Sequence, residues 1–331
     1  MKKFILTLIL YIVILGIVVL SINYICVLSG ISDYEETSKF RKVPENIQIC
    51  NFGSSHGYFS FNYSDLETQY VSFNFALSSQ RLSYDYKILQ TYQDKLSPGA
   101  IVFIPVSYFS FFGKDETESA FFESLNRRYY RFLPKDKIKN LNPKVYFYER
   151  YLPSLVMADS IFTKLTNQIL GINEDIWDKN AYEIDVRKHA YGGNNKTIYG
   201  YVGHIKANVD DGGNRIYNYE EIISLYNMIA LCYQRDVTPI LVTTPFLKEY
   251  TNEIEKNDPK FYSDFNRILE RVIKDTNVQY YDYARDSRFS DDYSLFINSD
   301  HMNRVGATKF TYLLLNEVQK TTKINALKIE D

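Results

Sequence analysis

The chain opens with a continuous apolar stretch. Residues 4–22 carry no charge, and Lys2 and Lys3 precede them. About 20 apolar residues span a bilayer, and flanking lysines stay on its cytoplasmic side. The pattern predicts a single-pass membrane protein. Residues 1–28 would form a cytoplasmic stub and a transmembrane anchor, and the rest of the chain would lie outside the cytoplasm.

A cleaved signal peptide is the main alternative for this stretch. The apolar core of a signal peptide usually has ~7–15 residues and ends in small residues. The stretch here is longer, and it is followed by Asn23-Tyr24-Ile25-Cys26, which is bulky where a peptidase would cleave. Ile25 before Cys26 also argues against lipoprotein processing. We therefore expect an uncleaved anchor in the cell membrane, with a cytoplasmic N-terminus and an extracytoplasmic folded domain.

Five apolar runs of strand length follow a polar linker at residues 29–45. They are rich in β-branched and aromatic residues, as strands usually are, and they cover residues 47–52, 70–76, 100–106, 239–244 and 278–283. Segments with an apolar residue every three or four positions separate or follow them, for example Phe261, Phe265, Ile268 and Val272. Strands that alternate with helices predict an α/β fold with a five-stranded, mostly parallel sheet covered on both faces.

The alternation stops between about residues 113 and 217. This stretch contains a helical segment at 154–170, a turn-rich Gly192-Gly193-Asn194-Asn195 and the basic cluster Arg127-Arg128-Tyr129-Tyr130-Arg131. We expect a largely helical insertion within a domain that spans residues 46–331. Because ligands bind at the carboxyl ends of the strands in open α/β sheets, the insertion would overhang the site as a lid or partner surface. The basic cluster would be a solvated face or a dock for an anionic polymer.

Composition excludes several classes of protein. Of the 331 residues, 45% are hydrophobic and 24% are charged, so the chain is not disordered. The net charge of −2 argues against nucleic acid as a partner, which would require a basic surface. Cys26, Cys50 and Cys232 have neither metal-ligand spacing nor a disulfide pattern, and His189 and His204 have no acidic neighbours that would suggest a metal site. We expect no cofactor and no metal.

Two segments carry candidate chemistry. Gly53-Ser54-Ser55-His56 follows the first strand, where a sharp turn before a helix can expose a serine hydroxyl and point N–H groups at a developing oxyanion. An ordinary Gly-Ser loop is the alternative for this segment alone, and His56 would either stabilise the turn or touch substrate. His301, near the start of the last helix, would lie at the same sheet edge. Because serine needs a nearby base to become a nucleophile, the pattern predicts a Ser55–His301 pair.

These segments resemble blocks of the SGNH hydrolase-like superfamily, also called GDSL-like. Gly53-Ser54-Ser55-His56 is similar to the nucleophile block, and Asp300-His301-Met302-Asn303 with Gly306-Ala307 is similar to the C-terminal block. The stretch Asn74-Phe75-Ala76-Leu77-Ser78-Ser79-Gln80 is similar to the second block, and Pro105-Val106-Ser107-Tyr108 stands where the third would be. The resemblance covers about residues 46–110 and 218–325.

The resemblance implies a three-layer α/β/α, flavodoxin-like fold. It also implies Ser55 as the nucleophile, His301 as the general base, and backbone N–H groups of Ser55 and Ser79 as oxyanion donors, with Ser107 assisting. More narrowly, the chain resembles membrane-anchored, extracytoplasmic members that modify cell-envelope polymers. That resemblance implies acyl transfer or ester hydrolysis on an O-acetylated polysaccharide or on teichoic acid bearing D-alanine, beside a membrane-bound O-acyltransferase as partner.

The sequence also departs from the family pattern. Asn298 replaces the aspartate that orients the base, and its neutral carbonyl stabilises an imidazolium less than a carboxylate does. Asp300 could substitute, or the site could work as a Ser–His dyad. Ser78 or Ser79 replaces the oxyanion glycine, and the third block lacks its asparagine. These departures favour the alternative, a catalytically inactive scaffold or carbohydrate-binding protein in envelope assembly.

Overall fold

The computed structural model describes residues 1–64, 70–113, 120–172, 177 and 208–322. Contacts divide the chain into two units. The N-terminal unit joins residues 1–42 with 116–174, and the sheet unit joins 43–115 with 175–331. His189, His204 and the turn-rich residues 192–195 lie outside the described residues. The predicted lid stays a prediction.

The sheet unit is built on five strands in the order β2-β1-β3-β4-β5, and every neighbouring pair is parallel. The strands are β1 (Ile47–Asn51), β2 (Ser72–Asn74), β3 (Leu96–Pro105), β4 (Thr238–Thr243) and β5 (Gln279–Asp282). Each of the five strands overlaps one of the predicted apolar runs. The strand order reverses between β1 and β3, and open α/β sheets bind their ligands beyond such a switch point.

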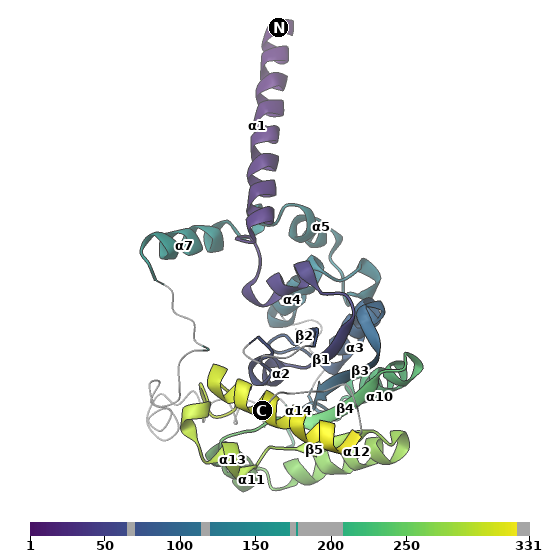
Figure 1. Cartoon of the computed structure of the whole chain (residues 1–331). Helices are drawn as coiled ribbons and strands as arrows, with labels where there is room; N and C mark the ends of the chain where they lie inside the picture. The colour runs from purple at the N-terminus through teal and green to yellow at the C-terminus, as the bar shows by residue number, and fades with distance from the viewer. Residues whose placement is uncertain (65–69, 114–119, 173–176, 178–207, 323–331) are drawn as a thin grey trace. The chain divides into compact units, whose positions relative to one another are not determined.

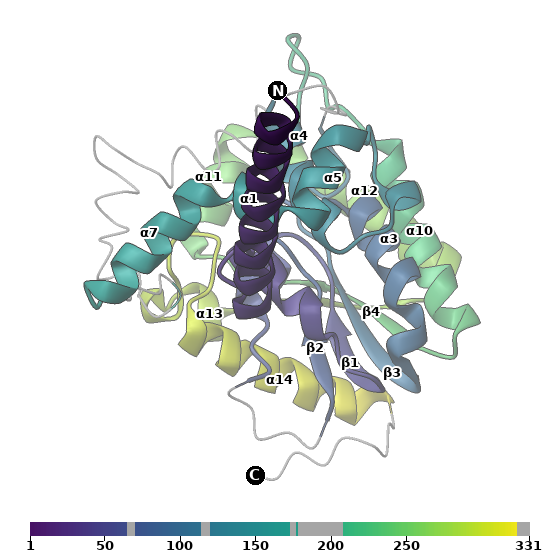
Figure 2. The same cartoon turned by 90° about the horizontal axis from the view of Figure 1, so that it is seen from above.

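Helices cover both faces of the sheet, as Figure 2 shows. One face carries α3 (Leu82–Tyr92), α10 (Tyr219–Gln234) and α12 (Lys260–Thr276), and the other carries α2 (Ser55–Ser60) and α14 (Arg304–Thr322). The shorter α11 (Lys248–Asn257) and α13 (Ser287–Ser290) complete the described α-helices of this unit, and short 3-10 helices lie at Gln93–Lys95 and Tyr293–Leu295. The predicted α/β fold class is confirmed.

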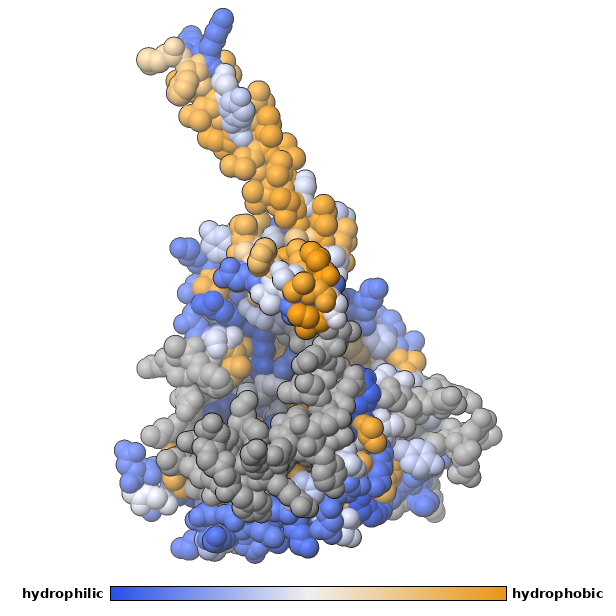
Figure 3. Space-filling model, turned by 90° about the vertical axis from the view of Figure 1, so that its left-hand side faces the viewer, coloured by the Kyte–Doolittle hydropathy of each residue, from blue (hydrophilic) through white to orange (hydrophobic). Residues whose placement is uncertain are grey.

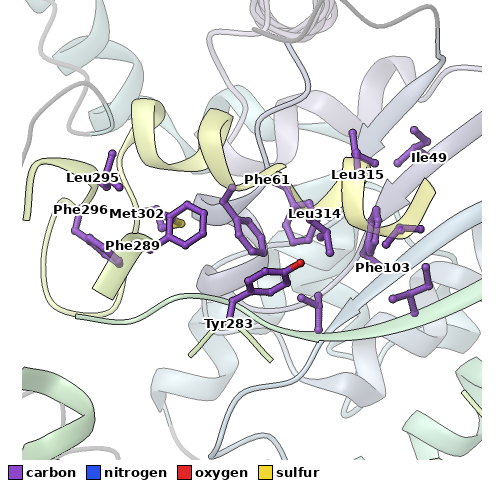
Figure 4. Packing of buried hydrophobic residues seen from close by; sticks show 14 of the residues in the cluster. Ile49, Phe61, Phe103, Tyr283, Phe289, Leu295, Phe296, Met302, Leu314 and Leu315 are labelled. Atoms are coloured by element: carbon purple, nitrogen blue, oxygen red, sulfur yellow. The ribbon is translucent and has the colours of Figure 1, made fainter. Parts of the chain in front are cut away.

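The core beneath α14 reaches the segment that carries His301. Phe310 and Leu314 of α14 pack on Phe61 and on strand residues of β1, β3 and β4, and the same cluster continues to Met302 (Figure 4). Burying a large apolar side chain stabilises the fold by roughly 1.5–3 kcal/mol. This packing fixes the backbone on one side of His301, because Met302 is the next residue.

Two glycines allow close approach near the site. A Cβ on Gly57 would overlap the backbone carbonyl of Phe52, so α2 can lie against the end of β1 only with glycine there. A Cβ on Gly306 would likewise overlap the carbonyl of Leu295, so the first turn of α14 needs glycine to pack on the preceding loop. Both contacts are with backbone atoms, which cannot rotate away as a side chain can.

The N-terminal unit consists of helices. Its α-helices are α1 (Lys2–Ser29), α4 (Ala120–Arg127), α5 (Pro143–Tyr151), α6 (Pro153–Val156) and α7 (Ala158–Ile169). Short 3-10 helices lie at Glu35–Lys42, Arg128–Arg131 and Lys135–Lys137. Among the described residues, α1 is the helix that is long and apolar enough to cross a membrane, with a mean hydropathy of 3.1 in its best window. A signal sequence can have the same length and composition.

The basic cluster is neither a solvated face nor a dock as a whole, and that prediction was wrong for two of its three arginines. The side chains of Arg128 and Arg131 are each only 9% exposed. Arg128 pairs with Glu36 at 3.4 Å, and Arg131 Nε donates to the buried Glu149 at 2.8 Å. Periodicity could not reveal this, because the partners come from residues 18 or more positions away in the sequence.

Candidate active site

The site lies where β1 and β3 end. Ser54 caps the N-terminus of α2, since its hydroxyl accepts a hydrogen bond from the backbone N–H of His56 at 3.4 Å. Ser55 is the first residue of α2 and is half-buried. Gly53 has a φ of 110°, a conformation that favours glycine. The predicted sharp turn between the first strand and a helix is therefore present.

A buried carboxylate holds this turn in place. Asp85 Oδ1 accepts hydrogen bonds from the backbone N–H of Gly53 at 2.8 Å and from Gln80 Nε2 at 2.5 Å. Gln80 also donates to the Gly53 carbonyl at 3.3 Å. The sequence analysis missed Asp85, because an aspartate in the first turn of a helix is common and only the tertiary fold buries it against Gly53.

Two asparagines fasten α2 to the sheet. Asn51 Nδ2 at the end of β1 donates to the Gly57 carbonyl at 3.0 Å and to Asn74 Oδ1 at 3.1 Å. Asn74 Nδ2 at the end of β2 donates to three carbonyls of the α2 segment, those of Gly57, Tyr58 and Phe61. Ser55 therefore stands on a backbone that is fixed from two strands.

Two imidazole rings meet at helix α2. His56 and His301 stack with their ring centroids 5.1 Å apart and their planes 13° from parallel. Phe59, one turn after Ser55 in α2, contacts the His301 ring, with the two ring centroids 5.2 Å apart. His301 is thus in contact with two residues of the helix that Ser55 begins, so the N-terminal and C-terminal segments meet in one place. The catalytic roles of Ser55 and His301 stay predictions.

Asn298 fixes the orientation of His301. Its Oδ1 accepts hydrogen bonds from the backbone N–H groups of Asp300 at 3.1 Å and His301 at 2.9 Å, and it also lies 3.1 Å from His301 Nδ1. Two backbone donors require an oxygen at this position, so the amide cannot present its NH₂ group to the ring. Nδ1 therefore carries the proton, and Nε2 is the basic nitrogen.

The Asp300 carboxylate lies close to one nitrogen of each ring. Its Oδ2 is 3.5 Å from His56 Nε2, and its Oδ1 is 3.6 Å from His301 Nδ1. The side chain is almost buried and also accepts from Ser299 Oγ at 3.3 Å. A carboxylate in this place stabilises a positive charge on either imidazole, and more strongly than in water because the surroundings are apolar.

Ser107 and His56 form a serine–histidine contact. Ser107 Oγ lies 3.1 Å from His56 Nδ1, whose ring packs between Phe109 and Phe246 and is 1% exposed. Ser107 is 3% exposed, and its backbone N–H already donates to Ser110 Oγ at 2.8 Å. A buried hydroxyl and an occupied N–H make Ser107 less suited to an oxyanion than predicted, although its role stays untested.

Ser79 has a backbone conformation that favours glycine. Its φ is 54°, in the left-handed region that favours glycine, and it is exposed at the tip of the turn after β2. The same turn is joined to Gly53 by the hydrogen bond from Leu77 N to the Gly53 carbonyl at 3.2 Å. Ser79 therefore lies on a loop that borders the Ser55 turn, and its role as an oxyanion donor stays a prediction.

The His56–Asp300–His301 cluster also has the composition of a metal site. Each side chain offers one ligand atom, and these atoms lie within 4.8 Å of one another. Metal ligation requires the in-plane lone pairs of both imidazoles to converge on one point. The nearly parallel planes of the stacked rings do not converge in this way. The arrangement suits proton transfer better than metal binding.

The comparisons with known proteins add a likeness of fold. No family model and no curated protein matches the chain. A mutant of an acetyl-xylooligosaccharide esterase from Geobacillus Stearmophilus aligns with 11% identity and a TM-score of 0.36, over 84% of this chain and 96% of the esterase. A lipase/acylhydrolase from Enterococcus faecalis aligns with 10% identity and a TM-score of 0.35, over 86% and 99%. At these scores we base no functional conclusion on either likeness.

Proposed function

We propose that this protein transfers or hydrolyses acyl esters through an acyl-enzyme on Ser55. One observation carries the proposal: Asn298 holds His301 with Nδ1 protonated, and the ring packs on the helix that begins with Ser55. A base in a fixed tautomer beside a serine at a strand–helix turn is the arrangement that nucleophilic acyl transfer requires.

The reaction proceeds in two halves. Ser55 Oγ attacks the acyl carbonyl carbon and passes its proton to His301 Nε2. The tetrahedral intermediate then collapses, the bond to the leaving oxygen breaks, and that oxygen takes the proton from Nε2. In the second half, His301 Nε2 removes a proton from an acceptor hydroxyl, which attacks the Ser55 ester. The second tetrahedral intermediate collapses, the bond to Ser55 Oγ breaks, and Oγ takes the proton back from Nε2. Water as the acceptor gives hydrolysis, and a sugar or polyol hydroxyl gives transfer.

In the family pattern a single aspartate both orients the catalytic histidine and stabilises its positive charge. Here Asn298 has the first role and Asp300 the second. Asn298 sets the ring orientation and tautomer. Asp300, 3.6 Å from His301 Nδ1, supplies the negative charge that stabilises the imidazolium formed after proton transfer. An asparagine beside a catalytic histidine usually costs about 10⁴-fold in rate because it selects the wrong tautomer. Here the two backbone N–H groups that donate to Asn298 Oδ1 keep this oxygen toward the ring, so the His301 tautomer with a protonated Nδ1 is retained.

A series at position 298 tests this division. Asn298→Asp is expected to keep at least the parental rate of ester hydrolysis, because a carboxylate accepts the same three hydrogen bonds and adds charge. Asn298→Leu is expected to lose roughly 10²–10⁴-fold, because the ring is no longer oriented. The measurement is hydrolysis of p-nitrophenyl acetate by each full-length variant, with thermal melting as the control for folding. A fully active Asn298→Leu protein would contradict the assignment.

The membrane anchor belongs to the same proposal. Asn23, near the end of the apolar run, is 7% exposed: its Nδ2 donates to the Tyr151 carbonyl at 2.9 Å, and its Oδ1 accepts from Ser154 Oγ at 2.8 Å. Cleavage after this point would remove the side chain that joins α1 to α5 and α6. This integration supports a retained, single-pass anchor with the N-terminus in the cytoplasm and the catalytic site outside it.

The substrate is the one that the family resemblance implies. Envelope polysaccharides and teichoic acids, whose hydroxyl groups carry acetyl or D-alanyl esters, would meet a site on the extracytoplasmic side. A membrane-bound O-acyltransferase would deliver the acyl group to Ser55 from the other side of the bilayer. The family resemblance in the sequence supports this assignment.

Trapping the intermediate tests the reaction. The full-length protein is mixed with p-nitrophenyl acetate, quenched in acid, digested and analysed by mass spectrometry. We expect one acetyl group on the peptide that contains Ser55. Acetyl groups spread over surface lysines with none on Ser55 would favour the inactive scaffold.

A further inference from the structure

Exposed apolar side chains gather around the outer end of α1. Outside α1, ten of the large apolar side chains exposed among the described residues belong to residues 147–172, and six belong to the sheet unit. Figure 3 shows apolar surface along α1 and a second apolar patch at its foot. The exposed apolar surface of the described chain is therefore concentrated where the apolar helix ends.

Helix α7 is amphipathic. Phe162, Leu165 and Ile169, at helical spacing, are 73%, 44% and 83% exposed, and Leu170 follows at 64%. Thr163 and Lys164 point away from this stripe. A soluble helix would turn such an apolar stripe toward a core, so the stripe here needs a partner outside the described residues.

Helix α7 is joined to the end of α1. Lys164 Nζ, on its polar side, donates to the carbonyls of Ile31 at 3.2 Å and Asp33 at 2.7 Å. A groove between the two helices is lined by Ile25 and Cys26 of α1 and by Ile161 and Leu165 of α7. In Figures 1 and 2, α7 runs across the foot of α1, with α5 on the other side of it.

The distances place α7 at the level of lipid headgroups. The hydrocarbon core of a bilayer is about 30 Å thick, and the headgroups add about 5–8 Å on each side. The apolar run of residues 4–22 that fills the core is followed by the polar Asn23. A helix rises about 1.5 Å per residue, so Ile25 and Cys26 lie about 5–6 Å beyond Ile22. Because these two residues line the same groove as Ile161 and Leu165 of α7, the apolar stripe of α7 lies at the outer boundary of the hydrocarbon.

We infer that α7 binds the outer surface of the same bilayer that α1 spans, with Phe162, Leu165 and Ile169 inserted at the boundary between acyl chains and headgroups. Interfacial helices have this composition: an apolar face that enters the boundary and a polar face turned to water. On α5, Phe147, Tyr148 and Tyr151 are also exposed and supply aromatic rings of the kind found at headgroup level. The inference rests on the proposed anchor, and it makes the N-terminal unit a two-point attachment that restrains rotation about α1.

Depth-dependent fluorescence quenching tests this attachment. The full-length protein carries Cys26→Ser. Cys50 and Cys232 stay in place because both are buried, and burial raises the pKa of the Cys232 thiol to about 12. A polarity-sensitive fluorophore is attached to Phe162→Cys, and the protein is placed in phosphatidylcholine vesicles whose acyl chains are brominated either near the headgroup or near the bilayer centre. Fluorescence at position 162 is expected to shift to the blue and to be lost most with the shallow bromines.

Two matched positions separate the outcomes. Thr163→Cys, the next residue on the polar side of α7, should be quenched little, and Leu15→Cys in α1 should be quenched most by the deep bromines. Quenching at 15 without quenching at 162 would overturn the inference and leave the anchor intact. No quenching at 15 would overturn the anchor and with it the inference. A blue shift at 162 without lipid quenching would show that protein covers α7 and would also overturn the inference.

Discussion

Replacing Ser55 by alanine is expected to lower ester hydrolysis by on the order of 10³- to 10⁶-fold, because the acyl-enzyme cannot form without its hydroxyl. Ser55 is the half-buried first residue of α2, and its side chain makes no hydrogen bond within the described residues, so the melting temperature should hardly change. The measurements are the rate of p-nitrophenyl acetate hydrolysis and labelling of the full-length protein by a serine-directed phosphonate.

The neighbouring serine is the matched control. Ser54 caps α2, and its loss should cost about 1 kcal/mol of stability. The Ser54→Ala protein should therefore have a lower melting temperature but still be labelled by the phosphonate. If Ser55→Ala were labelled as strongly as the parent and Ser54→Ala were not, the nucleophile would be Ser54. If all three proteins were labelled equally, neither serine would be the nucleophile.

Replacing His301 by glutamine is expected to reduce hydrolysis by roughly 10²–10⁴-fold, which is the usual contribution of a general base. His56 is a matched control for His301, because the centroids of the two rings lie 5.1 Å apart and only His301 is predicted to take the proton of Ser55. His56 is occupied on Nδ1 by Ser107 and faces Asp300 through Nε2. We therefore expect the smaller loss in His56→Gln.

The two histidine variants also differ in stability. His56 is packed among Phe109, Phe246 and His301, so His56→Gln should lower the melting temperature more than the change at the half-buried His301. Rates compared at a temperature where both variants are folded decide the assignment. A larger loss of activity in His56→Gln would make His56 the base and would direct attention to Ser107.

In cells, the same variants separate enzyme from scaffold. Loss of envelope esters with normal levels of Ser55→Ala protein supports the enzyme, and unchanged esters support a scaffold.

The sequence by itself determined the sheet and the place of the site. Apolar runs of strand length and helical spacing depend on neighbours within a few positions, so the five strands, the large helices and the apolar N-terminal helix could be read locally. Parallel strands bring their carboxyl ends to one edge, and this rule predicted without coordinates that the segments carrying Ser55 and His301 meet there.

Only the tertiary structure decided how the side chains of the site are arranged. The stacking of His56 on His301, the choice of Asn298 over Asp300 as the orienting group, and the support of Gly53 by Asp85 all join residues from separate elements. Tertiary contacts also group residues 116–174 with residues 1–42 and bury Arg128 and Arg131. Hydrogen-bond partners that are distant in sequence leave no periodic trace in it, because they are selected by packing after the chain has folded.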